Sequence, residues 1–201
     1  MEKTLKWILS NLLILAFWCS PVFAKNRITK KRHIASEYTE VNVKEKAKSF
    51  DMGCNEGFSL EVEKITHRFR YDYDSAKDPE RESTYFIATC PAGALNKASI
   101  LFYVDENTGL QAIALATPVM GEESKILGWR GNIVVDGLTY DPALDMLVSR
   151  SKTRNAGDMG IVATYAFLDN DVVLKRYEYD NTPNGKFDPK VVYEVSVPSS
   201  K

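Results

Sequence analysis

The sequence predicts an all-β protein: a single antiparallel β-sandwich or barrel-like domain of about nine short strands, preceded by a cleaved N-terminal signal segment. Short runs rich in β-branched and aromatic residues recur along the chain, and turn signals separate them at intervals of roughly 8–15 residues. Beyond the N-terminal segment, no long run has the apolar spacing of a helix. A length of 201 residues suits one domain with a substantial core.

The expected strands follow from alternating or continuous apolar runs. They are 58–65, 83–90, 98–104, 110–116, 132–140, 145–152, 160–168, 172–179 and 191–197. The sequence DENTG at 105–109 predicts a hairpin turn, and DND at 169–171 predicts another. Asp136-Gly137 is either a tight turn between very short strands or a bulge in one longer strand. Residues 41–50 fit either a short helix or an edge strand.

The N-terminal 24 residues have the organisation of a secretory signal peptide. Lys3 and Lys6 precede an apolar run, Pro21 breaks it, and cleavage is expected after Ala24. The alternative is an uncleaved membrane anchor, but an apolar run of about 12 residues is short of the ~20 that span a bilayer. We therefore expect no stable membrane insertion after cleavage, and a protein that is periplasmic or secreted.

Residues 25–52 are predicted to form a basic, partly mobile arm, and residues 53–201 the β domain. The stretch KNRITKKRH at 25–33 is strongly basic and almost without apolar residues, which is typical of a solvated arm. An alternative role is contact with an anionic lipid or polysaccharide surface. The whole chain has a formal net charge of −1, so no global field would attract nucleic acid.

The cysteine count predicts one disulfide. Of the three cysteines, Cys19 lies in the signal segment, which leaves Cys54 and Cys90 as an even pair in an exported chain. A redox pair would favour the C-x-x-C spacing, and a metal site would need nearby histidines or further thiols. Neither feature occurs, so a structural Cys54–Cys90 bridge is expected.

Two short motifs resemble the bacterial family named domain of unknown function 1176, over about residues 50–197. The matching residues are Cys90, Gly93, Ala94, Asn96, Leu147, Ser149, Lys152, Arg154, Gly157, Asp158 and Gly160. The resemblance implies an exported Gram-negative protein with a compact domain, and it implies no particular activity. Met159 stands where the family commonly has a cysteine, and Leu95 where it has an aromatic residue. The missing cysteine implies that a second bridge of the relatives is absent here.

The segment after residue 66 contains weaker candidates for a site. His67 is followed by Tyr71, Asp72, Tyr73 and Asp74, and a histidine near carboxylates is a possible acid–base group. Alternating aromatic and acidic side chains on a loop also suit a sugar or a cationic partner. No G-x-S-x-G, H-E-x-x-H or P-loop motif accompanies them, so no catalytic residue is assigned.

The stretch RNAGDMG at 154–160 is the principal candidate binding loop, with Arg154, Gly157, Asp158 and Gly160 as its candidate residues. It contains a guanidinium and a carboxylate four residues apart, between two predicted strands. The alternative is a turn that closes on itself through an Arg154–Asp158 ion pair.

Residues 180–191 begin like a calcium loop. Asp180, Thr182 and Asn184 have ligand spacing and Gly185 occupies the sharp-turn position, but Val191 replaces the glutamate expected at the twelfth position. The stretch PNG at 183–185 is also a strong turn signal by itself. We predict no metal and no cofactor.

Three functions fit these observations. The first is a non-enzymatic exported module that binds an envelope protein, peptide or glycan. The second is a hydrolase of cell-envelope polymers, with Asp72, Asp74 or Asp158 as acid–base candidates and His67 assisting. The third is a structural or stress-related envelope protein. The sequence identifies no specific ligand or reaction.

Overall fold

The computed structural model describes residues 38–69, 81–93, 96–153, 157–168 and 171–197, and residues 39–201 belong to one compact unit. The predicted signal peptide, the arm up to residue 37, the stretch 71–74 and Arg154 lie outside the described residues. Within the described part, no helix has the length and hydropathy needed to cross a membrane.

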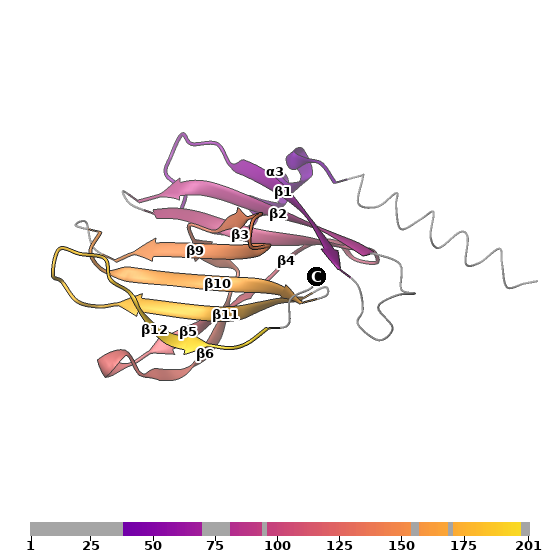
Figure 1. Ribbon diagram of the computed structural model, residues 1–201. Helices are drawn as coiled ribbons and strands as arrows, with labels where there is room; N and C mark the ends of the chain where they lie inside the picture. Colours follow the sequence, from indigo (N-terminus) through magenta and orange to yellow (C-terminus); the bar gives the residue numbers. More distant parts are fainter. Residues whose placement is uncertain (1–37, 70–80, 94–95, 154–156, 169–170, 198–201) are drawn as a thin grey trace, which may run out of the picture. The chain divides into compact units, whose positions relative to one another are not determined.

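The described chain is mostly β, which confirms the predicted fold class (Figure 1). It contains one α-helix, α3 (Glu40–Ala47), one 3₁₀ turn, η1 (Glu122–Ser124), and twelve strands. The strands are β1 (Glu61–Phe69), β2 (Arg81–Ala92), β3 (Asn96–Asp105), β4 (Gly109–Ala112), β5 (Leu115–Met120), β6 (Ile126–Asn132), β7 (Val134–Asp136), β8 (Thr139–Asp141), β9 (Met146–Lys152), β10 (Gly160–Leu168), β11 (Asp171–Asp180) and β12 (Lys190–Glu194).

The strands form antiparallel sheets. The first sheet has the order β1-β2-β3-β4, with β7 also paired to β3, and the second has the order β12-β11-β10-β9-β8. The hairpin β5–β6 forms a separate two-stranded sheet, and β5 contacts β11. The two predicted hairpins are confirmed, since β3 pairs with β4 and β10 pairs with β11.

The two larger sheets share one hydrophobic core. Ile65, Tyr85 and Leu101 from the first sheet belong to the same buried cluster as Leu147 and Phe167 from the second. Strand β1 shows the two-residue period of an edge strand packed on one face, because its buried residues alternate with exposed ones from residue 64 onward. The central strand β2 is buried on both faces at residues 85–88.

Gly137 marks a crossing between sheets, so both predictions for Asp136-Gly137 were wrong. Strand β7, which ends at Asp136, pairs with β3, whereas β8 pairs with β9 in the other sheet. The Gly137 amide donates to the Lys97 carbonyl at 2.6 Å, and its φ is +54°. A Cβ at this position would lie 2.5 Å from the Arg150 carbonyl oxygen, so a residue without a side chain is needed for the crossing.

Residues 41–50, which fitted either a short helix or an edge strand, contain most of the helix α3. Thr39 precedes its first turn, and the Thr39 amide donates to the Asn42 side chain at 2.9 Å. Val43 and Ala47, four residues apart, are fully buried, and α3 packs against β1 and β2. The helix therefore belongs to the compact unit that begins at Thr39, and the predicted boundary at residue 53 falls inside that unit.

Candidate binding groove

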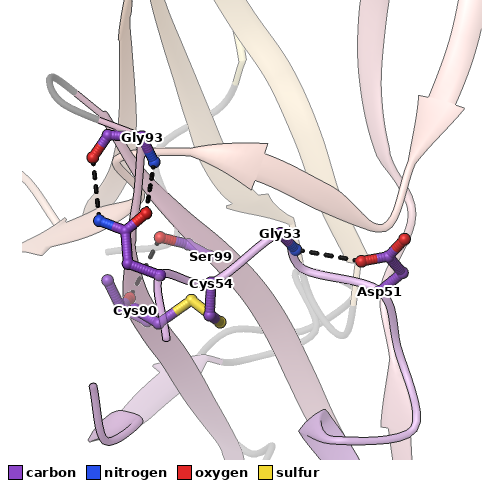
Figure 2. The surroundings of a disulfide bond; sticks show 8 residues. Asp51, Gly53, Cys54, Cys90, Gly93 and Ser99 are labelled. Carbon is purple, nitrogen blue, oxygen red and sulfur yellow. Dashed lines mark hydrogen bonds between the residues drawn. A yellow bond between two sulfur atoms is a disulfide. The ribbon is translucent and has the colours of Figure 1, made fainter. Parts of the chain in front are cut away.

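The predicted disulfide is confirmed, and it anchors the segment that follows α3 (Figure 2). Cys54 bonds to Cys90 of β2, with 5.6 Å between the two Cα atoms. The next residue adds three hydrogen bonds to the end of β2. The Asn55 side chain donates to the Gly93 carbonyl and accepts from the Gly93 amide, both at 3.0 Å, and the Asn55 amide donates to the Pro91 carbonyl at 2.8 Å. A disulfide indicates an oxidising environment outside the cytoplasm.

The anchored segment and α3 line a groove of about 590 Å³. Its lining residues are Lys44, Ala47, Lys48, Phe50, Asp51, Met52, Gly53, Cys54, Phe58, Ser59 and Leu60. We call this feature the α3 groove. Most of these side chains are apolar, and its volume lies in the range of ligand pockets. Phe58 is 62% exposed, so a large aromatic surface is available for contact at the groove. Phe50 is held by an edge-on contact with Phe102 of the core at 6.1 Å between ring centroids.

The charges at the α3 groove are mainly positive. Lys44 and Lys48 are one helical turn apart, and neither has a carboxylate within 4.0 Å in the described part of the chain. The Asp51 carboxylate accepts a hydrogen bond from the Gly53 amide at 3.2 Å, which ties it to its own turn. The groove therefore offers an apolar surface beside two ammonium groups.

His67 is a core residue of β1, and its partner is Asp145. It is fully buried, and its ring stacks on Phe167 and Phe69 at centroid distances of 4.6 and 5.7 Å. The Nδ1 atom bonds to Asp145 Oδ2 at 3.0 Å, and the Tyr140 hydroxyl donates to Asp145 Oδ1 at 2.9 Å. Burial, and then the bond to Asp145, raise the pKa of Tyr140 to about 12, so this hydroxyl remains a donor at neutral pH. The candidates of residues 71–74 lie outside the described residues.

Asp145→Ala is expected to lower the free energy of unfolding by about 3 kcal/mol, because a buried imidazole N–H and the Tyr140 hydroxyl both lose their acceptor. His67 Nε2 is already buried without a partner among the described residues, so the bond to Asp145 is important to this side chain. Asp145 also has φ +52°, which asparagine tolerates better than alanine. Asp145→Asn should therefore cost roughly half as much in urea unfolding. Equal losses for the two variants would contradict this account.

Asp158 connects the 154–160 loop to the turn that contains Gly185, and Gly160 begins strand β10. Asp158 is 4% exposed, and its Oδ2 atom accepts from the Gly185 amide at 3.0 Å. The Thr153 amide donates to the Met159 carbonyl at 3.1 Å, and Gly160 pairs with Lys152 where β9 and β10 meet. The described residues of the 154–160 loop thus make hydrogen bonds at the connection between β9 and β10. The predicted Arg154–Asp158 pair lies partly outside the described residues.

The calcium-like segment is held by its own hydrogen bonds. Asp180 Oδ1 accepts from the Thr182 amide at 2.9 Å and hydroxyl at 2.6 Å, and Oδ2 accepts from the Asp188 amide at 2.7 Å. The Thr182 hydroxyl, followed by these amides, lowers the pKa of Asp180. Asn184 Oδ1 accepts from the Lys186 amide at 2.9 Å. The oxygens that calcium would need already stabilise a turn, and the described residues contain no cluster of three metal-ligating side chains.

The described acid–base candidates do not converge. His67 stacks on Phe167 near the end of β10, whereas Asp158 precedes Gly160 at the start of that strand. Phe167 lies seven positions after Gly160 in this extended strand, which corresponds to about 23 Å. His67 and Asp158 therefore lie toward opposite ends of β10 and share no site.

The fold and the groove define a disulfide-bonded all-β domain with a basic, apolar-lined cleft. No family model, no curated protein and no solved structure matches the chain.

Proposed function

We propose that this chain is an exported envelope protein, periplasmic or secreted in a Gram-negative bacterium, that acts by binding through the α3 groove and not by catalysis. The observation that carries the proposal is the groove of about 590 Å³, where a mostly apolar lining lies beside Lys44 and Lys48. The predicted signal peptide and the Cys54–Cys90 bridge support export. The resemblance to the domain of unknown function 1176 family agrees with export and stays a prediction.

Among an envelope protein, a peptide and a glycan, the groove favours a peptide segment. A glycan needs many hydrogen-bonding side chains, whereas the lining here is dominated by residues such as Phe50, Met52 and Leu60. Lys44 and Lys48 have no ion-pair partner among the described residues, and two such ammonium groups favour acidic residues in the ligand. We infer a ligand that combines large apolar side chains with aspartate or glutamate.

The described residues give little support to the other two functions. The hydrolase alternative needs converging carboxylates or a histidine at a cleft. His67 is fully buried, and it stacks on Phe167 near the end of β10, whereas Asp158 lies just before the start of that strand. A purely structural role does not need an apolar groove with Phe58 exposed at its edge.

Selection of a displayed random-peptide library on the mature protein tests the proposal. We expect enriched peptides to carry acidic residues next to large apolar ones. In fluorescence anisotropy, K44E/K48E should bind an enriched peptide about tenfold or more weakly, because two attractive charges become repulsive. The matched control is K125E/K186E, which makes the same charge change at two exposed lysines outside the groove and should bind like the wild type. Enriched peptides without acidic residues, or equal binding by K44E/K48E, would refute the proposal.

A further inference from the structure

A second cavity, of about 160 Å³, is lined by the β5–β6 hairpin, by β7 and by the second sheet. It shares no residue with the α3 groove. Its lining is rich in polar side chains, of which six matter here: Thr117, Arg130, Asn132, Asp136, Tyr165 and Tyr177. Arg130 and Asn132 alternate along β6 and so face the same side of the hairpin.

Some of these polar groups are engaged by the protein itself. The Asn132 side-chain Nδ2 donates to the Thr117 hydroxyl at 3.0 Å, and the Tyr165 hydroxyl donates to the Ala116 carbonyl at 3.2 Å. Asp136 Oδ2 accepts a hydrogen bond from the Ser151 hydroxyl. A carboxylate has further lone pairs, so Asp136 keeps capacity for a cationic group.

Two donors of the cavity have no protein acceptor among the described residues: the Arg130 guanidinium and the Tyr177 hydroxyl. The Tyr177 side chain lies mostly within the protein, since the residue is only 3% exposed. Burial, and then the neighbouring Tyr179, raise its pKa to about 12 although Arg130 acts in the opposite direction. The Tyr177 hydroxyl thus stays protonated at neutral pH, and Arg130 lines the same cavity.

We propose that this cavity binds a small zwitterion of the amino-acid class, whose carboxylate contacts Arg130 and the Tyr177 hydroxyl and whose ammonium group contacts Asp136. A ligand with a negative charge alone would be repelled by Asp136, and one with a positive charge alone would be repelled by Arg130. The volume corresponds to about five water molecules, which is sufficient for an amino acid as small as glycine or alanine. Ala163 and Ile161 supply an apolar wall for a methyl group.

Titration of the ¹⁵N-labelled mature protein with glycine and L-alanine, followed by NMR, tests the proposal. We expect saturable shifts with dissociation constants of about 1 mM or below, and at least roughly tenfold weaker binding of acetate and of methylammonium. R130Q and Y177F should each weaken L-alanine binding by roughly tenfold. D136N should weaken L-alanine binding while leaving acetate binding equal or stronger, which separates a lost charge contact from a general disturbance of the cavity.

The control R176Q removes an arginine of β11 that pairs with Glu178 and Glu194 and does not line the cavity. It should bind L-alanine like the wild type, and circular dichroism should show that every variant is folded. The proposal is overturned if neither zwitterion binds at about 10 mM, if acetate binds as well as L-alanine, or if R130Q and R176Q behave alike. None of these outcomes depends on the α3 groove.

Discussion

Replacement of both bridge cysteines by serine should lower the free energy of unfolding by about 4 kcal/mol. Cys54 and Cys90 are separated by 36 positions, and the stabilisation that follows from closing a loop of this length in the unfolded chain has that size. A loss of this size is a large part of the 5–15 kcal/mol that stabilises a typical domain. Urea unfolding of C54S/C90S beside the wild type, both followed by circular dichroism, measures the difference.

The same substitution should also loosen the α3 groove. Cys54 lines the groove and ties the segment after α3 to β2. Without the disulfide, the three hydrogen bonds of Asn55 remain to hold this segment to the end of β2. Reduction of the wild type should reproduce the loss of C54S/C90S, and Cys19 is absent from the mature chain if cleavage occurs after Ala24. A stability change below about 1 kcal/mol, or a reduced wild type as stable as the oxidised one, would show that the bridge constrains little.

The strand pattern was predictable because most strands carry their own signal. Strands β2, β3, β10 and β11 are rich in β-branched and aromatic residues, so their local preference agrees with their buried positions. Strand β6 was not predicted, because it contains Gly128, Arg130 and Gly131 and exposes most of its residues. Its pairing with β5 is a tertiary preference that a local pattern does not contain.

Asp136-Gly137 shows a second limit of local reasoning. The dipeptide predicted a turn or a bulge, but neither signal says which sheet the next strand will join. That choice depends on the Lys97 carbonyl, which accepts from Gly137, and on the Arg150 backbone, which leaves no space for a Cβ. Lys97 lies in β3 and Arg150 in β9, so neither residue belongs to the local sequence around Gly137.

The candidate sites were less predictable than the fold. Histidine is rare in this chain, and His67 was therefore considered as an acid–base group. It belongs instead to the core, and its partner Asp145 is 78 residues away in the sequence. The α3 groove was missed because its residues are common ones, and because they are divided between the segment described as a basic arm, up to residue 52, and the predicted β domain from residue 53. The available signal was the four-residue spacing of Val43 and Ala47, with Lys44 and Lys48 next to them. This spacing indicates an amphipathic helix only when its apolar side has β1 and β2 to pack against.

Gly160→Ala is expected to lower the free energy of unfolding by about 3–5 kcal/mol, because overpacking and an unfavourable backbone conformation add at one position. A Cβ at Gly160 would overlap the Ser151 carbonyl oxygen and lie 3.1 Å from the Ser151 carbonyl carbon and 3.2 Å from Lys152 Cα. These atoms are backbone of the paired strand β9, so they cannot move aside as the end of a flexible side chain can. The strands must separate at Gly160 or the residue must adopt another conformation.

Gly128→Ala is the matched control, since Gly128 also lies in a strand but has no heavy atom within 4 Å of an added Cβ. It should change stability by less than about 0.5 kcal/mol in the same urea experiment. If Gly160→Ala proved as mild as Gly128→Ala, the close approach of β9 and β10 at this point would be wrong. If the large loss is observed, the final glycine of the 154–160 motif has a backbone role that accounts for its presence without a ligand. The search for a bound partner then belongs at the α3 groove and the polar cavity, where side chains face open space.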